Sequence, residues 1–143
     1  MTEHSPRHLR SVLDTSTVIM LSRITDPAAL PAEPLITTLT LAELTVGPLV
    51  ARTDRERAAR QAHVQQAEAD FEPLPFDTPA ARAFGRVAAS LRQAGHKPSA
   101  RAYDAMIAAT AISRDLPVYT CNPADFTGID GLTVIAVRVP QQA

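Results

Sequence analysis

Short apolar runs alternate along the chain with longer segments whose apolar residues recur at helical spacing. Four runs rich in aliphatic and β-branched residues predict strands, at 9–13, 35–38, 116–120 and 133–137. The predicted helical segments are a helix that begins near residue 18, a brief turn at 26–27, and helices over 39–50, 54–70, 78–94 and 103–114. Strands that alternate with helices, with few hairpin signals, indicate an α/β fold in which helices flank a central parallel sheet on both faces.

Capping residues and helix breakers set several of the boundaries. Asp77 followed by Thr78-Pro79 is a strong helix start, and Gly95 supplies the left-handed residue that ends the same helix. Gly47-Pro48 is expected to kink or end the helix over 39–50, and the two prolines in 71–76 restrict that segment to a sheet edge or a connector. We find no internal repeat and no linker, so we expect one domain over 1–143, with frayed ends at about 1–6 and 140–143.

Composition excludes several classes of protein. The hydrophobic content of 45% argues against disorder, and no uncharged run exceeds nine residues, whereas a membrane helix needs about 20. A single cysteine, Cys121, excludes an internal disulfide, and the histidines are too scattered along the chain for a zinc site. The first ten residues hold no apolar signal segment, so a cytoplasmic protein without membrane contact is expected.

The charge is distributed unevenly. The formal net charge is −1, yet no acidic residue lies between Thr78 and Tyr103, which gives that stretch +5 and the rest of the chain −6. These basic residues are either a solvated helix face or a surface that contacts nucleic-acid phosphates. They are Arg82, Arg86, Arg92, Lys97 and Arg101.

Candidate chemistry lies where the predicted strands end, because open parallel sheets bind ligands at the carboxyl ends of their strands. Asp14 directly follows the first strand, and Asn122 and Asp125 follow the strand that ends at Thr120. Glu43 lies on the second turn of a helix, where its side chain can turn back toward the same edge. Asp104 opens a helix, and strand order alone does not place it at this edge.

Each of these acids also has a local explanation as a helix cap, a turn residue or a solvated side chain. Brought together, however, they would repel one another unless a cation lies among them, and oxygen ligands of this kind suit Mg²⁺ or Mn²⁺. The chain has no glycine-rich phosphate loop and no G-x-S-x-G motif. An acidic metal pocket beside a basic surface favours hydrolysis of phosphodiester bonds.

Four blocks of sequence resemble the PIN-domain family and, within it, the VapC-type toxins of type II toxin–antitoxin (VapBC) systems. The blocks are Leu-Asp-Thr-Ser at 13–16, the segment 40–47, the segment 103–111 and the segment 119–126. The resemblance covers nearly the whole chain in order and spacing. It implies a parallel sheet of about five strands, an endoribonuclease that depends on Mg²⁺ with Mn²⁺ as a substitute, and inhibition by a VapB-type antitoxin. It also implies a homodimer and a toxin–antitoxin hetero-oligomer.

The resemblance assigns roles to individual residues. Asp14, Glu43 and Asp104 match the three most regular metal-site acids of the family. Many relatives carry an aspartate where this chain has Asn122, so Asp125 is the candidate for the fourth acid, and the choice between one and two metal ions remains open. Ser16, Thr120 and Asn122 are candidates for orienting the carboxylates or water, although the two hydroxyls are equally well explained as cap and strand-end groups.

The basic stretch is expected to follow RNA phosphates, with Arg101 nearest to the scissile bond. Because aromatic residues make up only 4% of the chain, recognition by RNA shape or by a structured loop is favoured over base stacking. Three hypotheses follow: an active toxin ribonuclease, a PIN-like module that binds RNA or a partner without cutting, and an unrelated small α/β enzyme such as a phosphatase. The helices over 39–50 and 54–70 are candidates for an antitoxin-binding groove.

Overall fold

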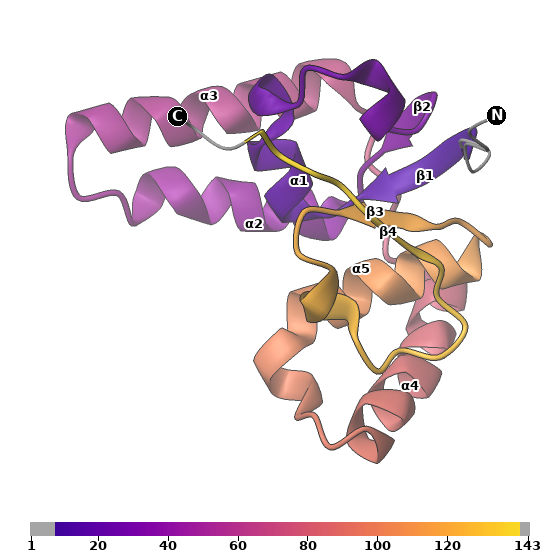
Figure 1. The fold of residues 1–143 in the computed structure, drawn as a ribbon. Helices are drawn as coiled ribbons and strands as arrows, with labels where there is room; N and C mark the ends of the chain where they lie inside the picture. The colour runs from indigo at the N-terminus through magenta and orange to yellow at the C-terminus, as the bar shows by residue number, and fades with distance from the viewer. Residues whose placement is uncertain (1–7, 141–143) are drawn as a thin grey trace, which may run out of the picture.

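The computed structural model describes residues 8–140, which form a parallel four-stranded sheet between two groups of helices (Figure 1). The strands are β1 (Arg10–Leu13), β2 (Glu33–Leu35), β3 (Val118–Thr120) and β4 (Val134–Ala136), in the order β2-β1-β3-β4. The predicted α/β fold is confirmed, with four strands where about five were expected. The ends predicted to fray lie outside the described residues, apart from Pro140.

Helices and 3₁₀ turns connect the strands. The helices of the described chain are α1 (Thr15–Ile19), α2 (Thr38–Leu49), α3 (Asp54–Asp70), α4 (Thr78–Gln93) and α5 (Ala102–Ser113). The 3₁₀ turns are η1 (Leu21–Arg23), η2 (Pro27–Ala29), η3 (Pro98–Arg101) and η4 (Pro123–Phe126). Within residues 8–140, no helix has the length and apolar character that crossing a membrane requires.

Two hydrophobic cores lie on opposite faces of the sheet, because successive strand residues point to opposite sides. Val12 and Val118 belong to the core formed with α4 and α5, which pack against each other. Leu13 and Tyr119, each one residue further along, belong to the core formed with α1, α2 and α3. Figure 1 shows α2 and α3 as an antiparallel pair on one side of the sheet and α4 and α5 on the other.

The second strand and the first helix differ from the prediction. The strand expected at 35–38 ends at Leu35, because Thr37 caps α2: its hydroxyl oxygen accepts a hydrogen bond from the backbone N–H of Thr40, over 3.3 Å. Pro34 lies within this strand, which is tolerated because β2 is at the edge of the sheet. The first helix begins at Thr15 rather than near residue 18, because Asp14 is its N-cap.

Other boundaries agree with the sequence. Segment 71–76 lies at the sheet edge, where Leu74 forms an isolated parallel bridge with Thr37. Asp77 caps α4, and Gly95 follows the helix with a φ of 84°. Helix α2 continues through Pro48 and ends one residue later.

Candidate active site

Asp14 lies at the carboxyl end of β1 and is 2% exposed. Its carboxylate accepts hydrogen bonds from the Thr17 hydroxyl at 2.6 Å and the Thr17 backbone N–H at 3.1 Å. The Thr120 hydroxyl donates to Oδ2 over 2.7 Å, and the Ser16 hydroxyl lies 2.9 and 3.1 Å from the two carboxylate oxygens. Asp14 is therefore both the cap of α1 and the point where α1, β1 and β3 meet.

These four donors fill the acceptor capacity of the Asp14 carboxylate, which is about four lone-pair sites. Thr17 and Thr120 are buried, whereas Ser16 is only partly buried. Ser16 is therefore the least buried of the three residues whose groups donate to Asp14. Ser16 and Thr120 are thus both in direct contact with Asp14.

Glu43 reaches the same region from the second turn of α2. The Thr15 hydroxyl donates to Glu43 Oε1 over 2.6 Å and lies 3.0 Å from the hydroxyl of Thr40. Burial raises the pKa of Glu43, the hydrogen bond from Thr15 opposes that rise, and the charge of Asp14 adds to it. The electrostatic influence of Asp14 shows that Glu43 belongs to one acidic group with it.

Asp104 is the member of this group whose ionisation is most strongly perturbed. Partial burial raises its pKa to about 6, helped by the negative charges of Asp125, Glu43 and Asp14, in that order, and opposed by Arg101. Asp104 on α5 is therefore near enough to the carboxylates on α2, on η4 and at the end of β1 for their charges to act on it, a placement that strand order alone did not predict.

Of the two candidates for the fourth acidic position, Asp125 is the one whose negative charge acts on Asp104. Asp125 is the largest electrostatic contributor to the raised pKa of Asp104. The Asn122 side chain is exposed, and its backbone N–H donates to the hydroxyl of Thr120 over 2.9 Å. Asn122 therefore supports Thr120, which in turn holds Asp14.

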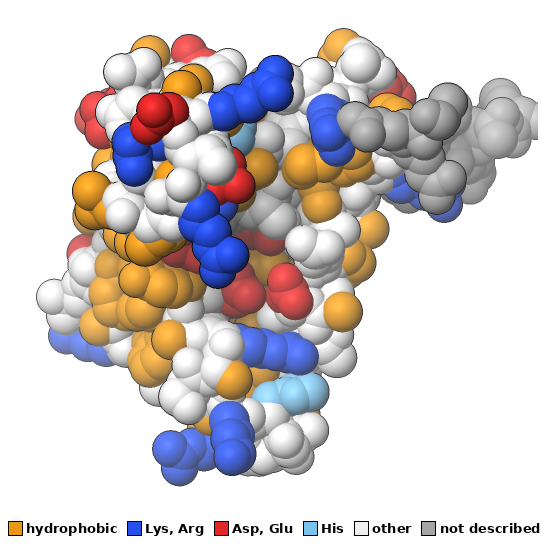
Figure 2. All heavy atoms as spheres, turned by 90° about the vertical axis from the view of Figure 1, so that its left-hand side faces the viewer, with side chains coloured by type: hydrophobic (Ala, Val, Ile, Leu, Met, Phe, Trp, Pro, Cys, Tyr) orange, Lys and Arg blue, Asp and Glu red, His pale blue; other side chains and the backbone are white. Residues whose placement is uncertain are grey.

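Arg101 is the basic residue that the structure brings to the acids. Its guanidinium donates to the backbone carbonyl of Ala124 at 3.2 Å, and the carbonyl of Asp125 lies 3.5 Å away, so it links η3 to η4 beside Asp104. Figure 2 shows acidic side chains near the middle of one face of the molecule, with basic side chains above and below them.

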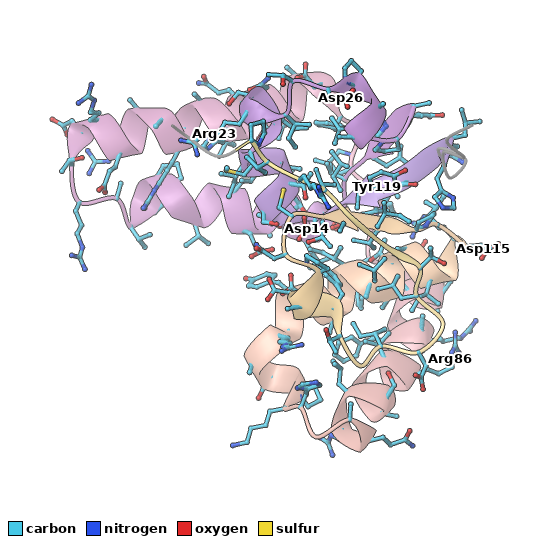
Figure 3. All side chains as sticks on the ribbon, viewed as in Figure 1. Asp14, Arg23, Asp26, Arg86, Asp115 and Tyr119 are labelled. Atoms are coloured by element: carbon cyan, nitrogen blue, oxygen red, sulfur yellow. The ribbon has the colours of Figure 1, made fainter. Side chains whose placement is uncertain are left out.

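The other basic residues of the stretch are exposed, and Arg86 lies away from Asp14. Arg82, Arg86 and Arg92 are exposed on α4, and Lys97 is exposed before η3. In Figure 3, Arg86 lies away from Asp14, on the side of the molecule where Asp115 precedes β3. The charge pattern predicted a track of basic residues beside the acids, from Arg82 to Arg101. Arg86 does not belong to such a track.

Sequence reasoning missed two hydroxyl side chains, Thr15 and Thr17. Both belong to the first turn of α1, where threonine is usually explained as part of a helix start. Thr17 had a signal, because an N-cap aspartate accepts a hydrogen bond from the residue three positions on. Thr15 had none, because its partner Glu43 is 28 residues away in the chain.

The carboxylate oxygens of Asp14, Glu43, Asp104 and Asp125 are ligands of the kind that a divalent metal ion prefers. Neighbouring negative charges contribute to the raised pKa values of Glu43 and Asp104, and a cation among these carboxylates would stabilise their ionised forms; hard cations prefer oxygen ligands. In the described part of the chain, no three His, Cys, Asp or Glu side chains are already placed to hold one ion together. Holding one ion would therefore require some of these acidic side chains to change rotamer.

The chain matches the PIN domain family over residues 11–132. It is 41% identical over 128 residues to Ribonuclease VapC5 of Mycobacterium tuberculosis, an alignment that covers 88% of this chain and 92% of the relative. It is 28% identical over 129 residues to Ribonuclease VapC1 of Rickettsia felis, with 88% and 95% covered.

The chain is also similar to solved structures of VapBC toxin–antitoxin proteins. The crystal structure of VapBC-5, a toxin–antitoxin system from Mycobacterium tuberculosis, matches with a TM-score of 0.77 and 40% identity, and covers 90% of this chain and 99% of the solved one. The crystal structure of DNA-bound VapBC from Salmonella typhimurium matches with a TM-score of 0.68 and 30% identity, with 88% and 96% covered. The four carboxylates, Asp14, Glu43, Asp104 and Asp125, all lie within the range 11–132 that matches the PIN domain family.

Proposed function

The chain belongs to the PIN-domain family, and on this premise we propose that it is the ribonuclease toxin of a toxin–antitoxin pair, which hydrolyses RNA with a divalent metal ion. The observation that carries the proposal is the group of four carboxylates, Asp14, Glu43, Asp104 and Asp125, at the carboxyl end of the sheet. The likeness to two ribonucleases along most of their length supports the choice of RNA as substrate.

We assign the metal to Asp14, Asp104, Glu43 and Asp125, with Mg²⁺ as the natural ion and Mn²⁺ as a substitute. A divalent ion held there supplies an acidified water and offsets the negative charge that develops on the phosphate. Thr120 and Thr17 hold the Asp14 carboxylate in place, and Thr15 holds that of Glu43. Arg101 offers a cation beside the acids that can bind a phosphate oxygen of the RNA.

The partner of the toxin is an antitoxin of the VapB type, since the similar solved structures are VapBC complexes. Helices α2 and α3, predicted to form the antitoxin-binding groove, pack against each other. At the C-terminal end of α2, Val46, Leu49 and the C-cap Val50 are 46%, 84% and 62% exposed, and this apolar edge is the surface we assign to the antitoxin. A homodimer remains a further proposal from the family.

Cleavage of RNA by the purified chain tests the function. Protein stripped with EDTA should be inactive, Mg²⁺ or Mn²⁺ should restore cleavage, and Asp14→Asn should stay inactive with either metal. Cleavage that persists in EDTA, or that Asp14→Asn retains, would contradict the assignment of a metal-dependent nuclease. Wild-type protein that binds RNA and Mn²⁺ without cutting would instead support the non-cutting module.

A further inference from the structure

A cavity of about 790 Å³ adjoins the acidic site, between α1 and the segment that follows β4. Ile19, Met20 and Val137 contribute apolar surface to it, and Ser16, Asn122 and Arg138 contribute polar groups. Its volume lies within the range of pockets that bind small organic groups, about 300–1,000 Å³. None of the residues assigned above to the metal is in its wall.

Two residues in the wall of the cavity take part in the hydrogen bonds that hold Asp14. Ser16 lies in the wall and its hydroxyl is 2.9 Å from Asp14 Oδ2. Asn122 also lies in the wall, and its backbone N–H donates to the Thr120 hydroxyl, which donates to the same Asp14 oxygen. A group bound in the cavity is therefore next to the position where the reaction takes place.

A second hollow, of about 260 Å³, adjoins the acids through different residues. Glu43, Arg101 and Asp104 are in its wall. Each hollow thus contains one arginine, Arg101 in the smaller and Arg138 in the larger. A polynucleotide that passes Asp14 needs cations for its phosphates on both sides of the bond that is cut, and this pair of arginines supplies them.

We propose that the larger cavity binds one nucleotide of the RNA substrate, adjacent to the scissile phosphate. The base packs against Ile19, Met20 and Val137, the side-chain amide of Asn122 contacts the edge of the base, and Arg138 binds a phosphate. This inference rests on the proposed ribonuclease function and names the part of the protein that selects the cleavage position.

Three features of the cavity favour a nucleotide. Arg138 is exposed and forms no ion pair with any other residue from 8 to 140, so its charge is available for a phosphate. The Asn122 side chain has no hydrogen bond to a described residue, and an amide can both donate to and accept from a base edge. Unstacked loop bases present an apolar face, which enzymes bind between aromatic or apolar side chains.

The test compares four variants on one probe, a pool of RNA hairpins with randomised loop nucleotides. Ile19→Trp fills the cavity from its partly exposed wall, and Leu9→Trp places the same side chain on an exposed residue at the opposite end of β1. Arg138→Ala removes the cation, and Arg86→Ala removes one that lies away from Asp14. Thermal unfolding and Mn²⁺ affinity are measured for all four and should match the wild type.

Ile19→Trp should raise KM for the pool about tenfold or more, the loss of one base contact, and should change which loop nucleotides flank the cut. Arg138→Ala should lower the slope of log affinity against log salt by about 0.7, measured by anisotropy in the Asp104→Asn background so that the RNA stays intact. Arg138→Lys should restore most of that slope. Leu9→Trp and Arg86→Ala should behave as the wild type.

Two results would overturn the inference while leaving the ribonuclease function intact. In the first, Ile19→Trp and Arg138→Ala cut the pool with wild-type KM, loop preference and salt slope. In the second, Ile19→Trp leaves RNA cleavage unchanged and weakens antitoxin binding, which would assign the cavity to the antitoxin. A wild-type protein that cuts no RNA with Mg²⁺ or Mn²⁺ would instead refute the proposed function, and the nucleotide site would fall with it.

Discussion

The hydroxyl of Thr120 donates a hydrogen bond to Asp14 Oδ2 over 2.7 Å and so ties the carboxyl end of β3 to that of β1. Both residues are buried, and the backbone N–H of Asn122 in turn donates to the Thr120 oxygen. This chain of hydrogen bonds fixes which way one carboxylate of the acidic site points. Hydrogen bonds to metal-binding side chains have this orienting role in many metalloenzymes.

Thr120→Val should therefore weaken Mn²⁺ binding and RNA cleavage by about 10–100-fold, the usual effect of losing a group that orients a metal ligand. Calorimetry and an initial-rate assay measure the two quantities. Thr120→Ser keeps the hydroxyl and should recover most of both. Equal metal affinity in the valine and wild-type proteins would show that Asp14 does not need this contact.

The raised pKa of Asp104 predicts how the stability of the metal-free protein depends on pH. Because its pKa is about 6 in the folded protein and 3.8 in the unfolded one, the folded state binds the proton more tightly. The stability that this group contributes is fully present below about pH 4 and is lost as the pH rises through about 6. Relative to Asp104→Asn, the wild type should become more stable as the pH falls from 7 to 4.

Thermal unfolding in EDTA across this range measures that difference. The comparison with Asp104→Asn removes the contributions of groups that titrate identically in both proteins. A difference in Tm between the two proteins that stays constant from pH 7 to 4 would contradict the coupling of Asp104 to the neighbouring acids.

Metal binding should show the opposite pH dependence. Cations bind the ionised carboxylates and compete with protons, so Mn²⁺ affinity should fall as the pH is lowered through about 6. The rise in Tm produced by a fixed concentration of Mn²⁺ should therefore be larger at pH 7.5 than at pH 5. The same rise in Tm at both values would mean that the ion binds away from Asp104.

The loop after η4 provides a test of the packing that positions Asp125. Gly128 has a φ of 89°, and a Cβ there would lie 2.9 Å from Ala94 Cβ. Gly131 has a φ of 81°, and a Cβ there would have nothing within 4 Å, so Gly131→Ala carries only the backbone cost of about 1–2 kcal/mol. Gly128→Ala should destabilise the protein by more than Gly131→Ala, because it adds the steric contact.

Gly85→Ala serves as the opposite control for this series. Gly85 is an exposed residue of α4 with open space around a Cβ, so alanine there should stabilise the protein by about 0.5–1 kcal/mol. Urea denaturation of the three variants gives their order. If Gly128→Ala proves no less stable than Gly131→Ala, the close approach of this loop to Ala94 is not present in solution.

Sequence could predict the parts of the site that follow from local rules. Asp14 follows a strand and caps a helix, and both roles are visible in the order of residues around it. The arrival of Asp104 at the same edge depends on how α5 packs against the sheet, which no strand pattern specifies. The resemblance to PIN domains supplied that placement, and the electrostatic coupling of Asp104 to Asp125 agrees with it.

The charge pattern was less informative than the hydrophobic pattern. Arg86 and Arg101 belong to one acid-free stretch of sequence, but α4 carries Arg86 away from Asp14 whereas Arg101 contacts η4. Arg138, outside that stretch, lies in the cavity beside the site. Residues whose charges are close in sequence are therefore not close in space here, because Arg86 lies on α4 and Arg101 lies after the end of that helix, in η3.

Binding of Mn²⁺ to the purified metal-free protein tests most directly whether the four carboxylates form a metal centre. The measurement is calorimetric titration at pH 7.5 of the wild type, Asp104→Asn, Asp125→Asn and the control Asp115→Asn, whose exposed side chain lies away from Asp14. We predict binding by the wild type and the control, and an affinity at least about tenfold lower in the other two. Equal affinity in all four proteins, or no binding by the wild type, would contradict the assignment.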